Sequence, residues 1–98
     1  MPTTQRIQNA AHVATRLQAL LGHDQIVVHP HGSHLHIRLV EDDLETTVAR
    51  LTEISRTTFA AGFRNHAGRW EPLPGTGNLD EAIEIVFTCL EPYLQPYP

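Results

Sequence analysis

Residues 25–40 read QIVVHPHGSHLHIRLV, and this stretch has a clear strand pattern. Apolar and polar residues alternate along both halves of it, and a period of two is typical of a strand with one buried face. The apolar set is Ile26, Val28, Leu35, Ile37 and Leu39, and the polar set is His29, His34, His36 and Arg38. Both apolar sets share one face only if the loop around Gly32 has an even number of residues. The stretch therefore predicts a β-hairpin with an apolar face and a histidine face.

The histidines of this hairpin are the strongest local signal in the chain. His29, His34 and His36 are expected on the outer face, with His31 in the turn beside them. Imidazoles on paired strands have Cβ atoms about 5–7 Å apart, so two or three could close on one Zn, Ni or Cu ion. The spacing matches no zinc-site pattern, and no Cys or acidic residue joins the cluster. Three interpretations stay open: a solvated face, a metal site, and a pH-sensitive or anion-binding surface.

Helical periodicity is expected in three other segments. Residues 5–21 repeat apolar positions every three or four residues, after Thr3 or Thr4 as a cap. Residues 42–56 are predicted to form a second helix, with Asp42 or Asp43 as its cap and Leu44, Val48, Leu51 and Ile54 as its buried stripe. A third helix should begin after Asn78, which forms a capping box with Glu81, and run to about residue 91 or 94.

A second hairpin is predicted over residues 59–73, with its turn at residues 65–68. In the even-loop register Trp70 lies opposite Phe63, so both rings are expected to point into the core. An exposed Trp70 would instead indicate a contact hot spot. Pro72 removes a backbone donor, which places the return strand at a sheet edge.

The chain is thus expected to be a single two-layer α+β domain, residues 1–98, in the order α-β-β-α-β-β-α. Its four-stranded sheet would be mainly antiparallel, with the helices packed on one face. Residues 25–56 and 59–91 read as two copies of a hairpin followed by a helix, and a Pro-rich tail occupies residues 92–98. The element order resembles that of small domains of the secretion-chaperone type. That resemblance implies a non-catalytic dimer.

Composition limits the cellular location and the partners that we expect for the protein. The chain has 98 residues, a formal charge of −4, one cysteine and seven histidines. It has seven Arg and no Lys, a bias typical of a GC-rich, bacterial genome. No secretory leader is visible, and no apolar run reaches the roughly 20 residues of a membrane span. We expect a soluble, cytoplasmic protein without membrane contacts. The negative charge argues against nucleic acid as a partner.

Two features point to a partner. The last helix is apolar around most of its circumference, more than one sheet needs to cover it, which favours a homodimer or another protein partner. The hairpins carry arginines and histidines while most acids lie in and around the helices. The candidate contact residues are Arg38, Arg64, Arg69, Ile85, Cys89 and Tyr93.

Signs of catalysis are weak. Cys89 sits among apolar neighbours, where a thiol is usually inert packing, and residues 75–78 match neither nucleotide-binding fingerprint. No nucleophile, base and orienting group assemble in the sequence. The leading hypothesis is therefore a non-enzymatic interaction module that acts as a homodimer and needs no cofactor. The alternatives are a metal- or pH-responsive surface on the histidine hairpin, and an enzyme or a binder of anions or nucleic acid.

Overall fold

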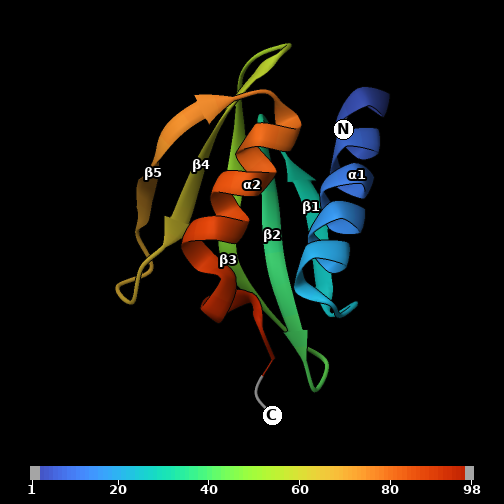
Figure 1. Ribbon diagram of the computed structural model, residues 1–98, viewed down its shortest axis with the longest axis vertical. Helices are drawn as coiled ribbons and strands as arrows, with labels where there is room; N and C mark the ends of the chain where they lie inside the picture. The colour runs from blue at the N-terminus through green and yellow to red at the C-terminus, as the bar shows by residue number, and fades with distance from the viewer. Residues whose placement is uncertain (1–2, 97–98) are drawn as a thin grey trace.

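The computed structural model describes residues 3–96 as two helices packed on a five-stranded sheet (Figure 1). The elements are α1 (Thr4–Leu21), β1 (Ile26–His31), β2 (His34–Glu41), β3 (Leu44–Ser55), β4 (Thr58–Arg64), β5 (Trp70–Gly77), α2 (Leu79–Leu90) and a 3-10 turn, η1 (Glu91–Leu94). The strands lie side by side in chain order, and every neighbouring pair is antiparallel. The α+β class, the antiparallel sheet and the helices on one face are confirmed. The sheet has five strands rather than four.

The predicted helix over residues 42–56 is wrong, because this segment forms β3, the longest strand. Its leucines do recur at helical spacing, but Leu44 is 68% exposed and Ile54 is 60% exposed, so they form no buried stripe. The burial pattern instead has a period of two: Ala49 and Leu51 are completely buried, and Arg50 between them is not. The segment is also rich in β-branched residues, which pack well in strands and lose side-chain freedom in helices.

Asp42 and Asp43 cap no helix but form the two-residue turn between β2 and β3. Their φ angles are 50° and 66°, and Glu41 pairs with Leu44 across the turn. Positive φ at both central residues is the signature of the type I′ turn, which matches the twist of a hairpin. Aspartate tolerates this conformation better than most residues. The element order is therefore α-β-β-β-β-β-α.

The register predicted for the first hairpin is confirmed. His31 pairs with His34 across the two-residue turn Gly32-Ser33, so the loop is even. The apolar positions of both strands consequently point towards the helices, and His29 faces His36 on the other side. Gly32 has a φ of 60°, a conformation that glycine adopts without the steric cost a Cβ would bring.

The second hairpin has a different register from the predicted one. Asn65 organises the expected turn, since its side-chain oxygen accepts hydrogen bonds from the amides of Ala67 and Arg69. The connection, however, comprises residues 65–69, an odd number, so Trp70 pairs with Arg64 and Phe63 pairs with Glu71. Shifting a register by one residue turns a side chain to the other face. The expectation that Trp70 anchors the core is therefore wrong.

The core lies between the sheet and the two helices, which also contact each other. Thr3 caps α1, which ends at Gly22, and Asn78 and Glu81 form the expected capping box of α2. The wide apolar face of α2 is partly accounted for within the chain: Ala82, Ile83 and Val86 are fully buried. In residues 3–96, no helix has both the length and the apolar character for a membrane crossing.

Three further expectations depend on these elements. Residues 59–91 form a hairpin and a helix as predicted, whereas residues 25–56 form three strands, so the first of the two predicted copies has no helix. The resemblance to secretion-chaperone domains was based on an element order that the chain does not have. Of the Pro-rich tail, Pro92 and Tyr93 belong to η1, and residues 97 and 98 lie outside the described residues.

Candidate functional site

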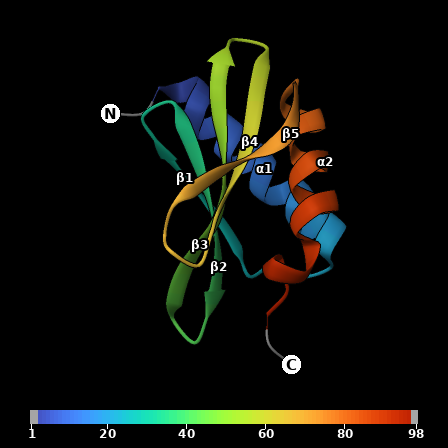
Figure 2. The same cartoon turned by 90° about the vertical axis from the view of Figure 1, so that its left-hand side faces the viewer.

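The face of the sheet that points away from the helices is the candidate functional site, and we call it the open face. One row of paired residues crosses all five strands on this face. The row consists of His29 on β1, His36 on β2, Arg50 on β3, Gly62 on β4 and Pro72 on β5. Figure 2 shows that β5 curls across the other strands, with α2 beside the sheet at the right and α1 farther from the viewer. The curl brings side chains from non-adjacent strands together.

Trp70 is the clearest product of this curl, because its indole reaches across β4 to side chains on β2 and β3. The guanidinium carbon of Arg50 lies 4.3 Å from the centre of the indole, a cation–π contact. The imidazole of His36 lies 5.5 Å from the indole, centre to centre. Gly62 lies beside the Arg50 side chain, and a Cβ built there would stand 3.2 Å from the Glu71 carbonyl oxygen.

Two more histidines extend the contact. The ring centres of His31 and His36 are 5.0 Å apart, and those of His34 and His36 are 6.2 Å apart. His34 Nδ1 lies 2.8 Å from the hydroxyl of Thr52, its cross-strand neighbour, in a hydrogen bond that fixes the imidazole. We call His31, His34, His36, Arg50 and Trp70 the ring cluster.

The ring cluster keeps its inner histidines uncharged. Partial burial, together with the nearby His31, Arg38, His34 and Arg50, lowers the pKa of His36 from 6.5 to about 4. Burial, Arg50 and His31 also lower the pKa of His34. At neutral pH both side chains are therefore neutral, planar aromatic rings, and positive charge near them comes from the arginines.

Glu45 contacts two further basic side chains of the open face, His29 and Arg38. Its Oε1 lies 3.1 Å from His29 Nε2 and 3.6 Å from Arg38 Nη1. The second contact is longer than a hydrogen bond, and Arg38 Nε is buried with no hydrogen-bond partner within residues 3–96. His29 and Arg38 thus form a separate group, on the same face as the ring cluster but directed towards an acid.

The predicted metal ligands are only partly brought together. His34 and His36 lie in one cluster with His31, whereas His29 turns to Glu45. In the described part of the chain, no three His, Cys, Asp or Glu side chains converge closely enough to hold a metal ion. Zn, Ni or Cu binding stays a prediction, with His31, His34 and His36 as the side chains nearest to one another.

The predicted contact residues fall in different places. Arg38 lies on the open face, and Arg69 lies in the β4–β5 turn. Cys89 and Tyr93 line a hollow of about 550 Å³ between the end of α2 and the sheet, on the helix side, and Arg64, which pairs with Trp70, lies at its edge. Ile85 is half-buried against the backbone of Gly75. Sequence reasoning therefore joined residues that belong to two separate surfaces.

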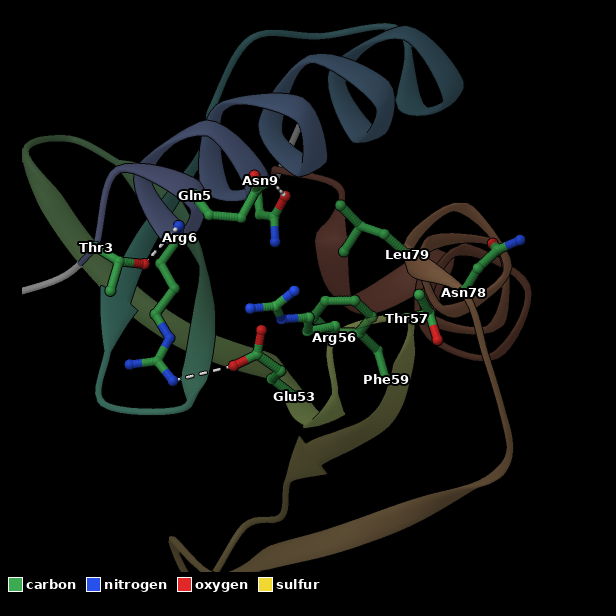
Figure 3. A pocket seen from close by; sticks show the side chains of 10 residues that line it. All are labelled: Thr3, Gln5, Arg6, Asn9, Glu53, Arg56, Thr57, Phe59, Asn78 and Leu79. Carbon is green, nitrogen blue, oxygen red and sulfur yellow. Dashed lines mark hydrogen bonds and ion pairs between the residues drawn. The ribbon is translucent and has the colours of Figure 1, made fainter.

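A larger hollow, of about 780 Å³, lies between the first turn of α1, the β3–β4 turn and the start of α2 (Figure 3). Arg6 Nη2 forms an ion pair with Glu53 Oε2 at 3.0 Å on one wall. The Arg56 side chain extends into the hollow, without an ion-pair or hydrogen-bond partner in residues 3–96. Because Glu53 neutralises Arg6, this hollow offers one unpaired guanidinium on an exposed turn.

Sequence reasoning missed Arg50 and Trp70, the two residues that complete the ring cluster. A signal for Arg50 was present, since it alternates with Ala49 and Leu51 as a strand residue does. Trp70 had no such signal, because its face depends on whether the preceding turn is odd or even. Arg56 was missed because its segment was predicted to be helical.

No family model, curated protein or solved structure shows significant similarity to the chain. The function is therefore argued from the geometry of the two faces.

Proposed function

We propose that this protein is a non-enzymatic binding module whose binding surface is the open face of its sheet. The observation that carries the proposal is the ring cluster, in which side chains of β1, β2, β3 and β5 are in continuous contact on the face without helices. Tryptophan and arginine are the residue types most enriched at energetically important contact positions. A merely solvated strand face has no need to gather them.

The cost of the arrangement supports the same proposal. Holding His36 with a pKa of about 4 keeps its imidazole neutral beside two arginines, an arrangement that a surface serving only solubility would not need. Perturbed titration on a surface cluster is typical of functional sites. The groups present, neutral aromatic rings and guanidinium, recognise ligands by stacking and by charge, and neither requires a bond to be made or broken.

The proposal is tested by mapping where probes bind. Amide and imidazole NMR shifts of the intact protein would be followed during separate titrations with ZnCl₂, with a polyglutamate peptide and with oligo(dT). At least one probe should shift resonances of His36, Arg50 and Trp70 more than those of buried helix residues such as Val13. If all three probes leave the open face unchanged, or shift the helix side alone, the proposal is wrong.

A second candidate function, homodimerisation, is favoured by the end of α2. Tyr93 is 62% exposed beside the exposed Cys89, at the rim of the smaller hollow, and Arg64 lines the same hollow. We infer that a second copy would cover this hollow and the exposed Tyr93. Light scattering at high micromolar concentration should then give twice the chain mass, and Tyr93→Ser should reduce it. A monomeric wild type contradicts this candidate.

A further inference from the structure

The open face combines planar ring surfaces with positive charge, and this combination fits one class of polymer. Stacking on aromatic side chains is sequence-tolerant, and histidine serves as a stacking ring as well as tryptophan does. In the ring cluster, His31, His36 and Trp70 lie in succession with ring centres 5.0 and 5.5 Å apart. The neutral state of His36 matters here, since an uncharged imidazole loses little hydration when a base covers it.

The positive charges lie beside the rings. Arg50 stacks on Trp70, and among residues 3–96 no acidic side chain forms an ion pair with it. Glu53 is three residues from Arg50 on β3 but pairs with Arg6, and Glu45, four residue pairs beyond the His36–Arg50 pair, contacts His29 and Arg38. On the helix side, by contrast, Asp80 and Glu84 contact His12 and Arg16. A polyanion is therefore directed to the open face and away from the helices.

We propose that the open face binds single-stranded nucleic acid, with bases stacked on the ring cluster and phosphates paired with Arg50. This inference deepens the proposed function and rests on it. Five strands about 4.8 Å apart span about 19 Å, which accommodates a few nucleotides. The overall charge of −4 argued against this ligand at the level of composition, as did the inward position expected for Trp70. The register of β5 removes the second objection.

Other classes of ligand would contact fewer groups of the ring cluster. In a duplex the bases are stacked on one another, so their faces are not available to the rings. An acidic peptide would pair with Arg50 but would not use the imidazole rings of the cluster for stacking. A small anion fits the unpaired Arg56 in the larger hollow as well as it fits Arg50, and it gives no reason for the rings to gather.

The test measures the affinity of the full chain for fluorescein-labelled oligo(dT) of about 15 nucleotides, by fluorescence anisotropy at low salt. Binding should be saturable and should weaken as salt is added. Arg50→Gln and Trp70→Leu should each weaken it about ten-fold or more. Arg56→Gln removes the same charge from the helix side, where Arg56 has no partner to lose within the described residues, and should change affinity less than two-fold. Circular dichroism melts confirm that each variant is folded.

The outcomes distinguish failure of the nucleic-acid ligand from failure of the open face as a binding surface. The inference is overturned if oligo(dT) does not bind, if a duplex of equal length binds as tightly, or if Arg56→Gln weakens binding as much as Arg50→Gln. Polyglutamate binding at the open face without oligo(dT) binding refutes the nucleic-acid ligand and leaves the proposed function standing. If none of the NMR probes reaches the open face, both fall.

Discussion

The two faces of the sheet differ in burial and in side-chain chemistry, although the same strands form both. On β2, Ile37 is completely buried under the helices, and His36, one residue earlier, lies on the open face in contact with Trp70. The covered face holds aliphatic, small and phenylalanine side chains, and the open face holds imidazole, indole and guanidinium groups. Alternation along a strand thus lets one sheet separate the residues that stabilise the fold from those available for recognition.

The largest change in stability is expected from a comparison of two adjacent positions on β2. Ile37→Ala removes buried methyl groups and leaves a cavity, so it should lower the free energy of unfolding by about 2–5 kcal/mol. His36→Ala, on the other face, should lower it by less than about 1 kcal/mol. Urea denaturation measures both values. Similar losses for the two variants would show that the open face contributes to the core after all.

A smaller effect is expected at the β2–β3 turn, which reverses the chain so that β3 pairs with β2 in the sheet. Asp43 has a φ of 66°, so Asp43→Val should cost about 1–2 kcal/mol, because a β-branched residue is strained there. Asp43→Gly should be neutral or stabilising. Thermal melts distinguish this from a helix over residues 42–56, in which glycine would destabilise.

A further effect concerns pH. The unfolded chain protonates His36 near pH 6.5, whereas the folded chain resists protonation until about pH 4. The unfolded state therefore binds more protons between these values, and stability should fall as the pH is lowered from 6.5 to 4. The groups around His36 are His29 and His31 on β1, His34 and Arg38 on β2, Arg50 on β3 and Trp70 on β5. His36→Asn should flatten the dependence of the melting temperature on pH; an unchanged slope would refute this cause.

Much of the fold could be predicted from the sequence where local rules act alone. The first hairpin, both capping motifs and the two real helices depend on patterns within a few residues. The segment 42–56 could not be settled in this way, since Leu44 and Leu51 fit a helix and Ala49, Arg50 and Leu51 fit a strand. The outcome depends on β2 and β4, which supply backbone hydrogen-bond partners on both sides of β3.

The candidate site was less predictable than the fold for a related reason. The face of each hairpin histidine follows from one even turn, which the sequence indicated. Bringing Arg50 and Trp70 to them needs a third strand, an odd-numbered connection at residues 65–69 and the curl of β5 across the sheet. These are tertiary effects, so a residue at position 70 cannot be assigned to a face from its neighbours.

The position of Trp70 on the open face, beside His36, can be tested through the intrinsic fluorescence of this single tryptophan. A protonated imidazole quenches a neighbouring indole. Emission of the wild type should therefore fall as His36 becomes charged, with a midpoint near pH 4, while circular dichroism shows that the chain is still folded. His36→Asn should abolish this step. Emission that stays constant with pH in the folded protein, or the same step in both proteins, would contradict the contact between His36 and Trp70.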